Sequence, residues 1–110
     1  MRYLMFVCTD PSAEEYDPAQ DNIESWVSEM DRRGIRVLGN RLCGVDQAVT
    51  IRKRNGRVLR TDGPFAETKE WVAGFDIIEC AGLDEALEVA AQHPMARFGR
   101  IEVRPFWPAG

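Results

Sequence analysis

Residues 61–70 read TDGPFAETKE and join two predicted β-strands, 57–60 and 71–80. A β-hairpin loop usually has two to five residues, so this connection is about twice the expected length. Asp62 is able to hydrogen-bond to its own backbone, and Gly63 allows backbone angles that are closed to other residues. These features predict a connection with a defined shape.

Two more residues of the same loop support this interpretation. Pro64 fixes its own φ, and Phe65 is a large apolar side chain on an otherwise polar segment, so we expect it to dock onto another part of the protein. We interpret the segment as an ordered loop over a cleft. The alternative is a rigid turn that only aligns two strands.

The composition is that of one globular domain, residues 1–110, with a net charge of −4. This charge argues against direct binding of nucleic acid. The first apolar run, 4–8, is too short for a membrane span or a signal-peptide core, so we expect a cytoplasmic protein without a membrane partner. Cysteines without CxxC spacing fit buried thiols in a reducing compartment: Cys8, Cys43 and Cys80.

Two helices are indicated by apolar residues at spacings of three and four. The first covers 17–33, with Asp17 as its N-cap, and stops at Gly34. The second has Asp84 as its N-cap and ends at His93-Pro94, because the residue before proline disfavours the helical region. Its apolar stripe is Leu83, Ala86, Leu87, Ala90 and Ala91.

The other strands are predicted at 2–9, 35–43, 47–54 and 100–106. Asn55-Gly56 predicts a type I′ hairpin between 47–54 and 57–60. Without that hairpin the order is β-α-β-β-α-β, which is the α+β, ferredoxin-like arrangement with both helices on one face of an antiparallel sheet. Strand 2–9 is apolar on both faces, so we expect a homodimer that packs sheet against sheet.

A ligand pocket is expected on the sheet face without helices. Strand alternation suggests that Asp76, Glu102 and Arg104 share this face. They form either a structural ion-pair network or a site in which Arg104 grips an anion. His93, the single histidine, is either a general base or a helix-terminal group that bonds to backbone.

No ligand spacing for a metal, no Gly-rich phosphate loop and no dinucleotide fingerprint is present. We therefore expect neither a metal nor a cofactor.

The segment 62–70, DGPFAETKE, resembles the signature of the DGPF branch of the YCII-related family. Gly74-Phe75, 83–87 (LDEAL) and 99–105 (GRIEVRP) resemble the same family. The resemblance implies a dimeric α/β-barrel built from ferredoxin-like subunits. It also implies relatives that act on small aromatic compounds, including a chloride-eliminating lyase, and frequent association of the branch with sigma factors.

YCII-type relatives are thought to use a His in the first helix with a nearby Asp, but residues 17–33 contain no His. The resemblance therefore leaves Asp62 as the first acid–base candidate and His93 as the second. Our main hypothesis is a homodimer that binds a small anionic or aromatic molecule near Gly63, Pro64 and Phe65, with lyase or other acid–base chemistry at Asp62. The alternative is a non-catalytic regulatory or interaction module linked to sigma-factor-controlled transcription.

Overall fold

A computed structural model describes residues 1–63 and 70–108. Pro64 and Phe65, two of the predicted ligand-binding residues, lie outside the described residues. The strands are β1 (Arg2–Cys8), β2 (Arg36–Arg41), β3 (Val49–Arg54), β4 (Arg57–Asp62), β5 (Val72–Glu79) and β6 (Arg100–Pro105). The helices are η1 (Pro18–Gln20), α1 (Ile23–Arg32), η2 (Val45–Gln47), α2 (Leu83–Gln92) and α3 (Met95–Phe98).

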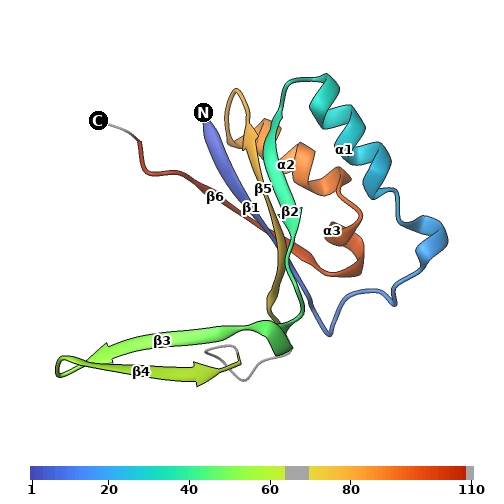
Figure 1. Cartoon of the computed structure of the whole chain (residues 1–110). Coiled ribbons are helices and arrows are strands. Elements are labelled where there is room, and N and C mark those ends of the chain that lie inside the picture. The colour runs from blue at the N-terminus through green and yellow to red at the C-terminus, as the bar shows by residue number, and fades with distance from the viewer. Residues whose placement is uncertain (64–69, 109–110) are drawn as a thin grey trace.

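Four strands form an antiparallel sheet in the order β2-β5-β1-β6, and β3 and β4 form a separate hairpin. Figure 1 shows the three α-helices on one side of the sheet, with the hairpin projecting from one end. The predicted α+β class is confirmed. The predicted hairpin turn is also found: Asn55 and Gly56 both have positive φ, 51° and 76°, as a type I′ turn requires.

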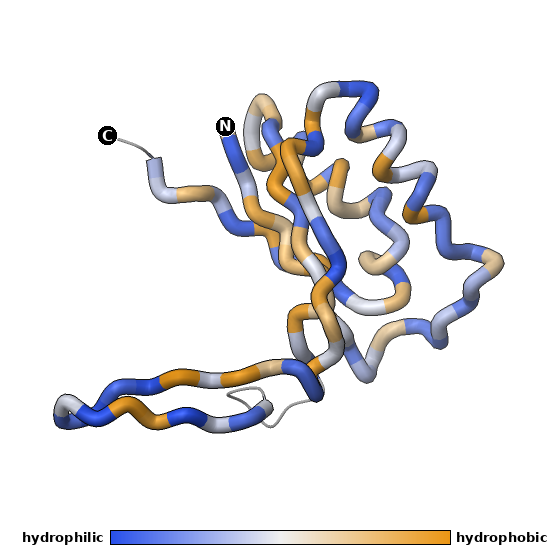
Figure 2. Tube along the Cα trace, in the orientation of Figure 1, coloured by the Kyte–Doolittle hydropathy of each residue, from blue (hydrophilic) through white to orange (hydrophobic). Residues whose placement is uncertain are grey.

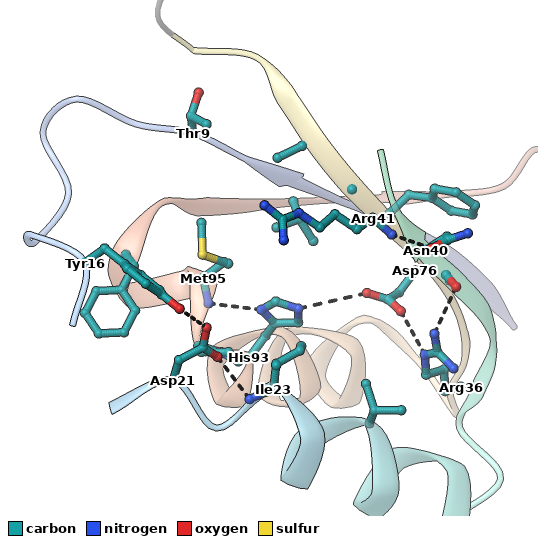
Figure 3. A pocket seen from close by; sticks show the side chains of 18 residues that line it. Thr9, Tyr16, Asp21, Ile23, Arg36, Asn40, Arg41, Asp76, His93 and Met95 are labelled. Carbon is teal, nitrogen blue, oxygen red and sulfur yellow. Dashed lines mark hydrogen bonds and ion pairs between the residues drawn. The ribbon is translucent and has the colours of Figure 1, made fainter. Parts of the chain in front are cut away.

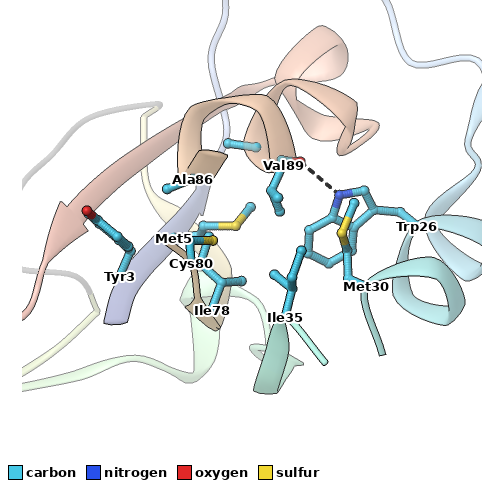
Figure 4. Packing of buried hydrophobic residues seen from close by; sticks show 10 residues of the cluster. Tyr3, Met5, Trp26, Met30, Ile35, Ile78, Cys80, Ala86 and Val89 are labelled. Carbon is cyan, nitrogen blue, oxygen red and sulfur yellow. Dashed lines mark hydrogen bonds between the residues drawn. The ribbon is translucent and has the colours of Figure 1, made fainter. Parts of the chain in front are cut away.

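The core fills the space between the sheet and the helices. Tyr3 and Met5 of β1 and Ile78 of β5 point toward α1 and α2, where Trp26 and Met30 are buried (Figure 4). The indole N–H of Trp26 donates to the backbone carbonyl of Val89, 3.0 Å away, and so ties α1 to α2 across the core.

The opposite face of the sheet carries no helix in the described part of the chain (Figure 1). Leu4 lies opposite Ile77, and Phe6 lies opposite Phe75, so apolar pairs run across the centre of this face. All four side chains are partly exposed. Figure 2 shows the same apolar character in the central strands and alternating character along the hairpin.

The first helix differs from its prediction. Asp17 caps only the short turn η1, by accepting from Ala19 N–H, and the regular helix begins at Ile23. Asp21 separates the two segments, and its side chain accepts the Ile23 N–H at 3.1 Å. Gly34 follows α1 with a φ of 69°, as expected for a residue that ends a helix.

The second helix is also corrected. Its N-cap is Gly82, two residues before the predicted cap, and Asp84 lies in the first turn. The buried stripe is Ala86, Val89 and Ala90, whereas Leu83 and Leu87 are 50% and 48% exposed. The helix ends before His93-Pro94 as predicted, and residues 95–98 then form the short helix α3.

No helix among the described residues is both long and apolar enough to cross a membrane.

Candidate functional site

A pocket of about 810 Å³ lies between the helices and the end of the sheet from which the hairpin departs. Its apolar walls come from Val7, Ile23, Val27, Met95 and Phe98. Its polar groups come from Tyr16, Asp21, Arg36, Arg41, Asp76 and His93 (Figure 3). The pocket is on the helix side of the sheet, so the expectation of a pocket on the helix-free face does not describe it.

Asp76 is the buried carboxylate of this pocket, with only 6% of its surface exposed. It lies opposite Met5 in the pairing of β1 with β5, and Met5 lies opposite Val103 in β6. Residues that are directly opposite share a face, so Asp76 points toward the helices. The prediction that Asp76 shares a face with Glu102 and Arg104 is wrong. The alternation of residues along a strand shows which side chains lie on the same face, but it does not show which of the two faces the helices cover.

Arg36 holds Asp76 in place. Its Nε donates to Asp76 Oδ1 at 2.9 Å, and its Nη2 donates to the carbonyl of Gly39 at 3.0 Å. Burial raises the pKa of Asp76, and the hydrogen bond and charge of Arg36 oppose that rise.

Gly39 makes room for this carboxylate from the neighbouring strand. It is paired with Asp76 in the register of β2 and β5. A Cβ at position 39 would overlap Asp76 Oδ1 and would lie 2.7 Å from the carbonyl oxygen of Phe75. Glycine in a strand interior often marks such a close approach.

His93 forms the other wall of the polar site. It follows α2, is 4% exposed, and packs edge-on against Trp26 with ring centroids 4.7 Å apart. Met95 N–H donates to its Nδ1 at 3.0 Å. Burial lowers the pKa of His93 to about 4, against a smaller opposing effect from Asp21. The imidazole is therefore neutral near pH 7, with its proton on Nε2.

His93 Nε2 faces Asp76 Oδ2 across 4.0 Å (Figure 3). This separation exceeds a hydrogen bond, so the donor and the acceptor border a small gap at the base of the pocket. The gap has an N–H donor on one side and a carboxylate oxygen with a raised pKa on the other. Such a pair is able to bind a hydroxyl group and to accept its proton.

The second acidic group of the pocket has partners of its own. Tyr16 donates its hydroxyl hydrogen to Asp21 Oδ2 at 2.5 Å, and this bond raises the pKa of Tyr16. Tyr16 also packs edge-on against Phe98, with centroids 5.4 Å apart.

The remaining predicted site residues lie elsewhere. Asp62 ends β4, its side chain is 82% exposed, and its carboxylate is paired with Arg60 at 3.1 Å. Gly63 has a φ of 106°, and its N–H donates to Ala48 at 2.7 Å. Neither lines the pocket, and neither do Glu102 and Arg104, which are exposed on edge strand β6.

Among the predicted site residues that the structure describes, it brings together Asp76 and His93 alone. Sequence reasoning missed Arg36 as the partner of Asp76 and Arg41 as a pocket residue. The available signal was glycine in strand interiors, since Gly39 lies opposite Asp76 and Gly74 lies opposite Arg41. Within residues 1–63 and 70–108, no three His, Cys, Asp or Glu side chains gather as metal ligands.

Comparison with known proteins places the chain in a family. It is 48% identical to an uncharacterized protein of Rhizobium meliloti (strain 1021), with 74% of this chain and 79% of the relative covered. Its fold is similar to 5-chloro-2-hydroxyhydroquinone dehydrochlorinase from Burkholderia phenoliruptrix AC1100, solved in complex with 2,5-dihydroxybenzoquinone. That similarity has a TM-score of 0.50 and 15% identity, covering 100% of this chain and 96% of the other. The YCII-related domain matches residues 1–109, so the chain belongs to the YCII-related family.

Proposed function

We propose that this protein binds a small hydroxylated aromatic molecule between its sheet and its helices, and that Asp76 removes a proton from the hydroxyl group. The gap of 4.0 Å between Asp76 Oδ2 and His93 Nε2 is the observation that carries this proposal. A ligand hydroxyl that lies beside this pair, about 2.8 Å from each atom, donates to the carboxylate and accepts from the imidazole N–H.

The proposed chemical step is a proton transfer. The ligand O–H bond breaks, the proton passes to Asp76, and the electron pair stays on the ligand oxygen. His93 stabilises the resulting oxyanion as a neutral donor. Its depressed pKa suits this role, since a neutral imidazole does not protonate Asp76 in place of the ligand. The raised pKa of Asp76 makes it a stronger base than an ordinary aspartate.

The dimensions and walls of the pocket support an aromatic ligand. A volume of about 810 Å³ falls in the range of small-molecule sites. Val27, Met95 and Phe98 offer apolar contacts to a ring. The fold likeness to an enzyme that is named for a hydroxylated aromatic substrate supports the same ligand class.

The test uses a chlorinated hydroquinone as the probe substrate and measures the release of chloride. After the first hydroxyl group loses its proton to Asp76, the neighbouring ring carbon that bears chlorine takes up a proton while the oxyanion becomes a carbonyl. Loss of the proton of the second hydroxyl group then accompanies cleavage of the C–Cl bond, so that chloride and a benzoquinone are the products. We expect Asp76→Asn to slow the release by about 10²–10⁴-fold, the usual contribution of a general base. We expect His93→Phe to slow it as well, because the N–H donor is lost.

Asp62→Asn separates this proposal from the sequence-based assignment of catalysis to Asp62. The Asp76 proposal expects the Asp62→Asn variant to keep the wild-type rate. Loss of the reaction in Asp62→Asn, with the rate retained in Asp76→Asn, would refute the proposal. Binding of the probe without any chloride release would favour the alternative, a non-catalytic regulatory or interaction module.

We also propose that the subunit is ferredoxin-like and forms a homodimer, as a dimeric α/β-barrel, through its helix-free sheet face. The strand order β2-β5-β1-β6 and the apolar pairs Leu4–Ile77 and Phe6–Phe75 support this assembly. Light scattering tests it: Phe6→Glu should yield monomers, whereas Leu83→Glu, on the outer side of α2, should not. A monomeric wild-type chain at micromolar concentration would rule the dimer out.

Membership of the DGPF branch and a cytoplasmic location complete the proposal. The first rests on the resemblance of residues 62–70. The second is supported by the three free cysteines, Cys8, Cys43 and Cys80, which fit a reducing compartment. Cys43 is exposed and lies outside β2, so it is not the buried strand residue that the sequence suggested.

A further inference from the structure

Arg41 places a positive charge at the mouth of the pocket. It is the last residue of β2, it is exposed, and it lines the pocket. Figure 3 shows its guanidinium extending over the space bordered by Met95, His93 and Asp76. Among the side chains that the structure describes, none forms an ion pair or a hydrogen bond with this guanidinium.

The other charged groups of the pocket are already engaged. Arg36 is bonded to Asp76 at 2.9 Å and lies 3.6 Å from Asp31. Asp21 accepts from the hydroxyl of Tyr16 and from a backbone N–H. Since His93 is neutral near pH 7, Arg41 is the charged pocket group that remains for a ligand within the described residues.

The sheet leaves room for a ligand beside Arg41. Gly74 is directly opposite Arg41 in the pairing of β2 with β5, so the two positions share a face. A Cβ on Gly74 would meet the Asn40 carbonyl oxygen at 3.0 Å, which makes glycine the residue that fits this close approach. No side chain from position 74 therefore competes for the space under the guanidinium.

We propose that Arg41 binds the carboxylate of the ligand, and that the natural ligand is a hydroxylated aromatic acid. This inference rests on the proposed function, because the ring hydroxyl occupies the gap between Asp76 and His93. The planar guanidinium presents paired N–H donors that match a carboxylate, and charge-assisted bonds of this kind are stronger than neutral ones. The pocket then binds the ligand at both ends, the carboxylate at Arg41 and the hydroxyl group at Asp76 and His93, and its apolar walls contact the ring between them.

Calorimetric titration of the full chain with three probes tests the two ends separately. The probes are a dihydroxybenzoate, the matching dihydroxybenzamide, which lacks the charge, and benzoate, which lacks the hydroxyls. We expect the wild-type chain to bind the dihydroxybenzoate about tenfold more tightly than the amide, a typical value for one charge-assisted contact. Added salt should reduce this preference, since Arg41 is exposed.

Arg41→Gln is the decisive variant. It should weaken binding of the dihydroxybenzoate about tenfold and leave binding of the amide unchanged. Arg57→Gln, an exposed arginine of the hairpin, serves as the matched control and should keep the wild-type preference. Glutamine is neutral, so the variant removes the ion pair with the ligand carboxylate. Because Arg41 is exposed, the shorter side chain creates no buried cavity.

Three outcomes overturn the proposal. The first is equal affinity of the wild-type chain for the acid and the amide. The second is an Arg41→Gln variant that weakens both probes alike, which indicates a structural role for Arg41. The third is no binding of either probe at millimolar concentration. Failure of the proposed function has a different signature: benzoate binds as tightly as the dihydroxybenzoate, while the preference for acid over amide persists.

Discussion

Acidification should destabilise this fold through His93. The imidazole is buried and neutral in the native state, and burial holds its pKa at about 4, below its ordinary 6.5. Between these values the unfolded chain binds a proton that the native chain does not bind. Stability therefore rises with pH, and it is lost as the pH falls through 6.5 toward 4.

The size of this effect follows from the two pKa values. Over the interval from about pH 8 to about pH 4.5, the linkage relation gives a loss of about 2.5 kcal/mol for this one group. His93 is 4% exposed, so solvent screening reduces the figure little. Asp76 acts in the opposite direction: its raised pKa stabilises the native state at low pH, and this contribution is lost as the pH rises through the native pKa.

The assay compares the wild-type chain with His93→Gln. Asp76 and the surface carboxylates contribute to the pH dependence of stability in both chains, so the difference between the two chains reports on His93. Urea unfolding is followed by tryptophan fluorescence at four pH values between about pH 8 and about pH 4.5. We expect the wild-type chain to lose about 2.5 kcal/mol more than the variant across that interval. Parallel stability curves would refute the reasoning.

An independent measurement uses the fact that the chain has one histidine. Its ring nitrogens give unambiguous NMR signals, and we expect the Nε2–H tautomer, because Met95 N–H already donates to Nδ1. A titration midpoint close to 6.5 would show that His93 is accessible to water, and the predicted loss of stability would then disappear.

Two other substitutions test how the site and the core are built. Gly39→Ala should displace the carboxylate of Asp76 and cost about 1–3 kcal/mol in the same urea assay, as overpacking does; an unchanged free energy of unfolding would contradict this close approach. Met30→Ala should lower the free energy of unfolding by about 2–5 kcal/mol, because Met30 is 0% exposed. Leu87, in the other long helix, is 48% exposed, so Leu87→Ala should cost much less. Thermal unfolding measures both variants, and equal losses would contradict the assigned core.

Much of the fold was predictable from local signals. Gly34 and the Asn55-Gly56 pair were placed correctly, and all three residues have positive φ, because few other residues adopt that conformation easily. The six strands and two long helices occur in the expected order. The break between η1 and α1 was missed, because Asp17 and Asp21 each accept a hydrogen bond from the backbone N–H two residues further on, and the sequence does not show which of these two segments begins the regular helix.

The candidate site was less predictable. Asp76 and His93 were selected individually, but Asp76 was assigned to the wrong face of the sheet. Both faces are apolar in β1 and β5, so the usual contrast between a buried and a solvated face was absent. Phe75 and Ile77 are larger and more apolar than Gly74 and Asp76, so the face that carries Phe75 and Ile77 was wrongly predicted to pack against the helices.

The sequence by itself determined the six strands, the two long helices and their order, because turns, helix ends and the alternation of strands depend on neighbouring residues. It also determined the family, through segments that include residues 62–70. The tertiary structure alone decided that Asp76, 40 residues beyond Arg36, meets that arginine and faces His93. Strand register and the side on which the helices pack are properties of the whole chain, so only the folded arrangement shows the candidate pocket around Asp76 and His93, which Asp62 does not line.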